Sequence, residues 1–206
     1  CATRIQATWR LQGFNATLRC AYLRTFMSSL RTQDWRDQRL NSLGRSSAPS
    51  TLFLRDSLTA KLRSYGRVKV HKIQQHWGLP KRDERLLLYR TDSKQHALIR
   101  EVILTVDDIP WVFARSVLPH ATLSGPSRFL RRWGTRPLGE FLFSHRDCYR
   151  SRFQFCQLSA EHPMMPSELR TSGSIWGRRS LFFLHQKPLI VAEYYLPAFL
   201  SALSEH

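Results

Sequence analysis

The fold is decided by the stretch from Ile99 to Pro119, which reads IREVILTVDDIPWVFARSVLP. Its first half alternates, so that one face of the expected strand carries Leu98, Arg100, Val102 and Leu104. Such alternation is typical of a β-strand, because successive side chains point to opposite faces. Asp107-Asp108 then supplies a turn before a second apolar run, Trp111 to Leu118. The stretch therefore predicts an antiparallel hairpin.

Further strands and helices are predicted on both sides of this hairpin. Strand character appears at Arg67 to Lys72 and at Arg152 to Leu158, and a second hairpin pairs Ser180 to Leu184 with Leu189 to Leu196. A short helix should begin near Asp56 or Ser57, and others near Ser124 and Pro137. Because tight turns join most strands, we expect an α+β fold with an antiparallel β-sheet and helices packed on one side.

The composition is that of a folded globular chain with an unusual charge. The 206 residues are 42% hydrophobic and carry a formal net charge of +17, which attracts nucleic acids, anionic lipids or anionic substrates. The arginines are spread from Arg4 to Arg179 and are not clustered among stacking aromatic residues. We therefore expect a solvated Arg-rich surface, no nucleic-acid partner, and a field that favours a small anionic substrate.

Cysteine, histidine and hydropathy patterns indicate neither a metal site nor a membrane span. The four cysteines form no C-x-x-C pair, and the eight histidines lack metal-ligand spacing. The longest apolar stretch, Leu181 to Leu203, is interrupted by charged residues and prolines that are costly in a bilayer. We expect reduced thiols in a cytoplasmic protein without stable membrane insertion, cofactor or metal.

The amino-terminal segment differs in composition from the rest. Residues 1–33 contain no acidic residue, the chain starts at Cys1, and its first methionine is Met27. We hypothesise that the native start is Met27, that residues 1–26 are a non-native or disordered extension, and that residues 27–206 form a single domain. Peptides from before Met27 in the natively expressed protein would contradict this.

Two charged residues lie where the pattern predicts apolar surroundings. Arg100 shares a strand face with Leu98 and Val102, and Glu193 shares one with Val191 and Tyr195. A buried charge needs a partner, so either residue is a candidate for binding a ligand. The alternatives are that the two charges pair with each other, or that their faces are solvated.

Five blocks in order resemble the bacterial chorismate pyruvate-lyases. They are DSLT at Asp56 to Thr59, the hairpin at Ile99 to Pro119, RPLGEFLF at Arg136 to Phe143, WGRRS at Trp176 to Ser180, and KPLIVAEYYLP at Lys187 to Pro197. The resemblance covers most of residues 51–198. It implies a chorismate-lyase-like fold with an internal ligand cavity under flaps, and a lyase that converts chorismate to 4-hydroxybenzoate and pyruvate for ubiquinone synthesis.

The resemblance also implies roles for four residues. Arg100 would hold the ring carboxylate, Glu193 would meet the product hydroxyl and the substrate ether oxygen, Leu138 would bind the ligand through its backbone, and Leu58 would supply an apolar flap contact. A planar guanidinium suits bidentate binding of a carboxylate. We expect Glu193, with a proton affinity raised by apolar neighbours, to act as a general acid. Because the reaction aromatises the ring, it needs no cofactor.

Two other functions compete with this interpretation. One is a ligand-sensing domain of the same general fold, as found attached to helix-turn-helix regulators, although residues 1–50 show no pair of helices suited to DNA recognition. The other is an Arg-rich nucleic-acid-binding module. For the lyase we expect a monomer whose only partner is the small substrate.

Overall fold

The computed structural model describes residues 35–37 and 56–204, and within them the expected central hairpin is present. It consists of β3 (Ala97–Val106) and β4 (Ile109–Pro119) in antiparallel register. Asp107 and Asp108 have φ values of 47° and 66°, the left-handed conformation that a two-residue hairpin turn requires. Aspartate tolerates this conformation better than most residues, so the turn follows from the sequence.

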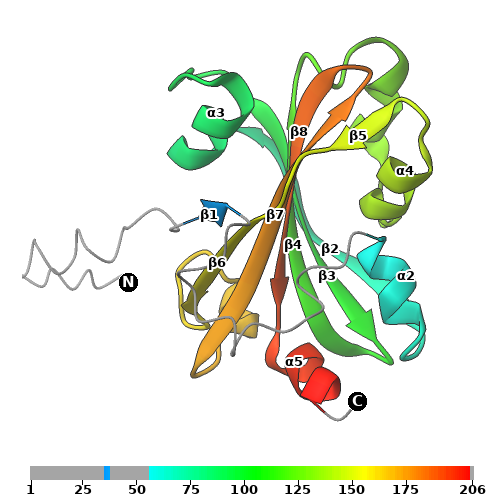
Figure 1. Ribbon diagram of the computed structural model, residues 1–206, viewed down its shortest axis with the longest axis vertical. Coiled ribbons are helices and arrows are strands. Elements are labelled where there is room, and N and C mark those ends of the chain that lie inside the picture. Colours follow the sequence, from blue (N-terminus) through cyan, green and yellow to red (C-terminus); the bar gives the residue numbers. More distant parts are fainter. Residues whose placement is uncertain (1–34, 38–55, 205–206) are drawn as a thin grey trace, which may run out of the picture. The chain divides into compact units, whose positions relative to one another are not determined.

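The remaining strands extend this hairpin into one antiparallel sheet (Figure 1). Its order is β1-β6-β7-β8-β4-β3-β2, and β5 also pairs with β7. The added strands are β1 (Arg36–Asp37), β2 (Val68–Gly78), β5 (Cys148–Arg150), β6 (Gln154–Ser159), β7 (Ser174–Leu184) and β8 (Lys187–Tyr195). The predicted second hairpin is therefore confirmed as β7 and β8, with a tighter turn at His185 and Gln186 and a longer first strand.

The helices are short and connect or cap the strands. They are α2 (Leu58–Arg63), α3 (Arg82–Tyr89), α4 (Leu138–Ser144) and α5 (Pro197–Ser204), with 3-10 helices η3 (Gly125–Arg132) and η4 (Ser167–Leu169). The helix expected after Ser124 is thus 3-10, and α3 is a helix that the sequence pattern did not predict. None of the described helices is both long and apolar enough to cross a membrane.

The two faces of the sheet are covered differently. The face that carries Leu98, Val102 and Val191 packs against α2, η3 and α4 through Leu58, Leu62, Leu130, Leu138 and Leu142. The other face packs against α3 and against the segment after β6, through Leu88, Met165 and Leu169. Figure 1 shows α3 on the side of the sheet opposite α2 and α4. The predicted antiparallel sheet with helices is confirmed. The helices lie on both faces, however, because α3 packs on the second face and its Glu84 pairs with the buried strand residue Arg115.

Residues 1–26 lie outside the described residues, as do 38–55. The hypothesis of a native start at Met27 therefore stays a prediction, and so does the extent of a single domain over residues 27–206.

Candidate functional site

Arg100 lies in β3 with only 3% of its surface exposed. One terminal nitrogen, Nη2, donates to the backbone carbonyls of Gly134 and Arg136, at 3.0 and 3.1 Å. Its Nε is buried and finds no hydrogen-bond acceptor within the described part of the chain. The described residues also place no carboxylate within ion-pair distance of this guanidinium. Since an uncompensated buried cation is costly, the site favours an anion.

The burial of Arg100 also changes the pKa of its guanidinium. Burial lowers the pKa of Arg100 to about 10. The guanidinium still carries its charge at neutral pH, because this pKa lies well above 7. A buried cation with a lowered pKa and a donor to spare is a frequent feature of binding sites.

Glu193 lies in β8, and its carboxylate is held by a second buried arginine. Arg178 of β7 donates from Nε to Oε2 of Glu193 at 2.5 Å. Only 2% of the Arg178 side chain is exposed, against 19% for Glu193. The pairing follows from the strand register, which sets Arg178 directly opposite Glu193. A neighbouring cation favours the ionised form of a carboxyl group, so this carboxylate is oriented and charge-compensated.

The register places Arg100 and Glu193 on the same face of the sheet. Arg100 pairs with Ser116 of β4, which pairs with Val191 of β8, and Glu193 lies two residues further along β8. Opposite residues in antiparallel strands point to the same face, as do residues two apart. With normal strand spacings, the two Cα atoms are on the order of 12 Å apart. Two long side chains at that spacing can reach a small aromatic acid from opposite ends.

Leu58 and Leu138 flank this face as the first residues of α2 and α4. Both are buried, with 4% and 5% exposed, and they pack in separate apolar clusters on either side of Arg100 and Glu193. An ion pair between Arg63 and Glu140 joins the two helices. Leu138 also follows closely the two carbonyls that Arg100 binds, so the guanidinium and the start of α4 lie together. The structure thus brings together all four residues that the sequence singled out.

Further polar atoms without partners face the same side of the sheet. Within the described residues, hydrogen-bond partners are lacking for Ser180 Oγ, Gln75 Oε1 and Tyr195 Oη. Gln75 and Ser180 lie in the same cross-strand row as Arg100. Buried polar groups in proteins are nearly always hydrogen-bonded, so their concentration here points to a ligand. Sequence reasoning missed these residues, although alternation in the WGRRS block places Arg178 and Ser180 on one face.

Comparison with known proteins identifies the family. A family model described as "Chorismate lyase" matches residues 30–203. A probable chorismate pyruvate-lyase from Methylococcus capsulatus is 42% identical over 156 residues, which make up 74% of this chain and 96% of that protein. One from Bordetella avium is 38% identical over 152 residues, 72% of this chain and 76% of the other. The chain belongs to the chorismate lyase family.

A solved structure supports the fold of this chorismate lyase family member. The effector domain of PhnF from Mycobacterium smegmatis superposes with a TM-score of 0.53 at 14% sequence identity, covering 69% of this chain and 90% of that domain. At such low identity the likeness concerns the fold alone. It agrees with the predicted antiparallel architecture.

The geometry decides one alternative and corrects one expectation about the charged residues. The alternative that Arg100 and Glu193 pair with each other does not hold, since Glu193 pairs with Arg178. The premise that Glu193 has only apolar neighbours is wrong for the same reason. Alternation along β8 gives the neighbours within a strand but not those on the adjacent strand, and Arg178 comes from β7.

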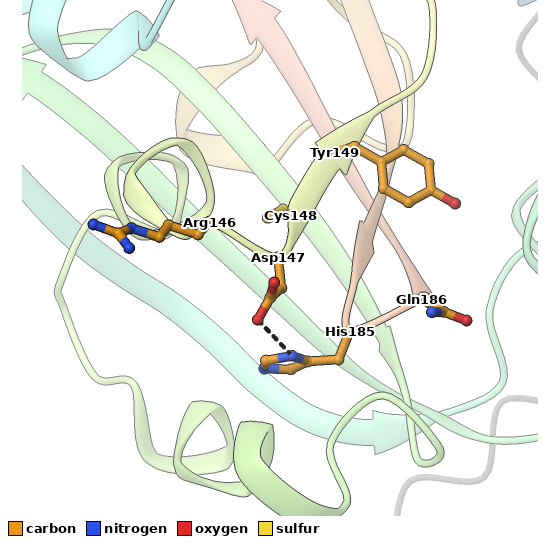
Figure 2. Close-up of a pocket in the computed structure, with 6 residues that line it drawn as sticks. All are labelled: Arg146, Asp147, Cys148, Tyr149, His185 and Gln186. Atoms are coloured by element: carbon orange, nitrogen blue, oxygen red, sulfur yellow. Dashed lines mark ion pairs between the residues drawn. The ribbon is translucent and has the colours of Figure 1, made fainter.

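An open pocket elsewhere is not part of this site. A hollow of about 470 Å³ lies at the β7–β8 turn. Figure 2 shows the residues that line it, which are Arg146, Asp147, Cys148, Tyr149, His185 and Gln186. His185 Nδ1 lies 3.6 Å from Asp147 Oδ2, and burial raises the pKa of Cys148 to about 11, which keeps the thiol protonated. None of the four family site residues lines this pocket.

Proposed function

We propose that this chain is a lyase that converts chorismate into 4-hydroxybenzoate and pyruvate. Its relatives carry the name probable chorismate pyruvate-lyase. The four expected site residues come from the sequence blocks that resemble this family. The observation that carries the proposal is the buried guanidinium of Arg100, with an unpartnered N–H, on the same sheet face as the carboxylate of Glu193. Such a pair can bind an aromatic acid by its carboxylate and its hydroxyl.

Arg100 binds the ring carboxylate in this proposal. Its Nη2 is occupied by two carbonyls, which fix the plane of the guanidinium and leave Nε to donate to the ligand. Leu138 supplies a second donor through its backbone, because the first N–H groups of a helix have no partner within the helix. Leu58 provides an apolar wall. The enclosed cavity around these groups, closed by flaps, is part of the proposal.

Glu193 manages the proton in the reaction. The hydrogen on the ring carbon that bears the hydroxyl leaves as a proton to the Glu193 carboxylate, and its electron pair forms the new ring double bond. The bond from the neighbouring ring carbon to the ether oxygen breaks. The proton then passes to the departing enolpyruvate, which becomes pyruvate. Glu193 is thus a carboxylate at rest, held by Arg178, and a general acid only in the second half of the reaction.

The reaction is redox-neutral and is driven by aromatisation, so we propose that no cofactor takes part. The basic surface assists capture of the dianionic substrate. By resemblance, the product would enter ubiquinone synthesis. We also propose a monomer that works in the cytoplasm without a nucleic-acid partner.

The direct test is incubation of the purified chain with chorismate while the ultraviolet absorbance of 4-hydroxybenzoate is followed. Product formation supports the lyase. Tight binding of 4-hydroxybenzoate without turnover supports the ligand-sensing alternative instead.

Glu193→Gln tests the role of the carboxylate. We expect kcat to fall about 100-fold or more, because general acid–base catalysis contributes 10² to 10⁴. The affinity for 4-hydroxybenzoate should change only a few-fold, since the amide still meets the product hydroxyl. Glu101→Gln is the matched control, because Glu101 is a buried strand carboxylate on the opposite face. Near-normal kcat in Glu193→Gln would reject the proton-transfer role even if the site is correct.

A further inference from the structure

Arg178 is held in one position by contacts on several sides. Besides its hydrogen bond to Glu193, its guanidinium carbon lies 4.7 Å from the ring centre of Phe153 and 5.8 Å from that of Tyr195. Only 1% of the residue is exposed. Cation–π contacts of this kind are stronger when water is excluded. The guanidinium therefore has little freedom to leave Glu193.

The charges in this part of the sheet favour a stable ion pair. Burial by itself would lower the pKa of Arg178, but the attraction and hydrogen bond of Glu193, together with the influence of Tyr195, outweigh burial and raise it. Burial also raises the pKa of Tyr195, so its hydroxyl stays neutral. Arg150 from β5 adds a further positive charge close to Tyr195. Arg178, Glu193 and Arg150 thus all act electrostatically on Tyr195.

We infer that Arg178 is a positioning residue for the lyase reaction, which holds Glu193 as an oriented carboxylate ready to accept the ring proton. The inference rests on the proposed function. Arg178 acts through Glu193, and it does so by both its charge and its geometry. Without it, the carboxylate of Glu193 would lose its hydrogen-bond donor and could rotate away from the reacting carbon.

The chain contains a close match for Arg178 in the next residue. Arg179 is also buried in β7, with 6% exposed, and also forms an ion pair at 2.5 Å, to Asp83 of α3. Because successive strand residues point to opposite faces, Arg179 faces away from the site. A substitution at Arg179 removes a buried, paired guanidinium without touching Glu193.

The test compares Arg178→Met, Arg178→Lys and Arg179→Met in the full chain, by kcat, KM and the melting temperature. We expect Arg178→Met to lower kcat at least tenfold with little change in KM, because the orientation of Glu193 affects proton transfer and not substrate binding. Arg178→Lys should restore part of kcat, since a cation then remains next to Glu193. Arg179→Met should lower the melting temperature and leave kcat and KM unchanged.

Several results would overturn the inference without touching the proposed function. One is a wild-type enzyme that makes 4-hydroxybenzoate while folded Arg178→Met keeps a near-normal kcat. Another is an equal loss of kcat in Arg179→Met, which would mean a general effect of losing a buried ion pair. If Arg178→Met does not fold, as judged by circular dichroism, Arg178→Lys decides: a change in KM with an unchanged kcat contradicts the inference. A wild-type chain without activity rejects the proposed function itself.

Discussion

Two buried arginines, one on each face of the sheet, have opposite surroundings. On the face covered by α3, Arg115 donates to both carboxylate oxygens of Glu84, at 2.7 and 3.0 Å, and to Glu101 at 2.5 Å. On the other face, Arg100 donates to two backbone carbonyls, and its Nε has no acceptor among the described residues. Both side chains are almost fully buried. The chain thus neutralises one arginine with its own carboxylates and leaves the other cation uncompensated.

The pKa values of Arg100 and Arg115 are shifted in opposite directions. Burial lowers the pKa of Arg100 to about 10, since no carboxylate opposes it. Burial also acts to lower the pKa of Arg115, but Glu84 and Glu101 together raise it above its usual value. The ion pairs of Arg115 with Glu84 and Glu101 connect α3 to the strands. The cation of Arg100, which has no carboxylate partner among the described residues, favours an anionic ligand. The comparison therefore supports a structural role for Arg115 and the proposed ligand-binding role for Arg100.

The largest effect that tests this comparison is on stability. Arg115→Met should reduce the free energy of unfolding by about 3–5 kcal/mol, because it leaves Glu84 and Glu101 buried without their cation. Arg100→Met should have little effect or should stabilise the fold, because it replaces an uncompensated buried charge by an apolar side chain. Urea unfolding followed by tryptophan fluorescence measures both. Equal losses in the two variants would show that the faces do not differ in this way.

The next largest effect concerns ligand binding, and it should appear in Arg100→Met. Arg100→Met should weaken binding of 4-hydroxybenzoate about 10- to 150-fold, because a hydrogen bond to a charged group contributes about 1.5–3 kcal/mol. Arg100→Lys should recover only part of this affinity, since an ammonium lacks the planar fork. Isothermal titration calorimetry measures the affinities, with Arg179→Met as the control. An unchanged affinity in Arg100→Met would remove Arg100 from the site.

The sequence predicted the face of Arg100 because the period of a strand is local. Alternation from Ala97 onward and the Asp107-Asp108 turn are sufficient to place Arg100 and Leu98 on one side of a hairpin. The resemblance to chorismate lyases added Glu193, Leu138 and Leu58. Arg100 and Glu193 lie on one face of the sheet, and Leu58 and Leu138 pack against that face; their roles in a site stay a prediction.

The sequence could not predict which strands would become neighbours. The pairing of Arg178 with Glu193 depends on the register of β7 against β8, and that of Arg115 with Glu84 on where α3 docks. The helix α3 was missed because its burial of Glu84 and Leu88 arises from tertiary contacts and not from a clear apolar stripe. Gly177 shows the same limit: a Cβ there would lie 2.8 Å from Cys156 Sγ of β6, a contact that only the assembled sheet reveals.

The smallest expected effect is the pH dependence of stability on the α3 side. The pKa of His162 is lowered, first by burial and then by the positive charges of Lys81 and Arg170. The unfolded chain therefore binds a proton at His162 more readily than the folded chain does, so stability should fall as the pH drops from about 7 to about 5. His162→Gln should flatten this dependence by less than about 1.4 kcal/mol per pH unit, the limit for a single proton. Urea unfolding at several pH values measures it. Parallel curves of stability against pH for the wild type and His162→Gln would show that protonation of His162 does not destabilise the folded chain.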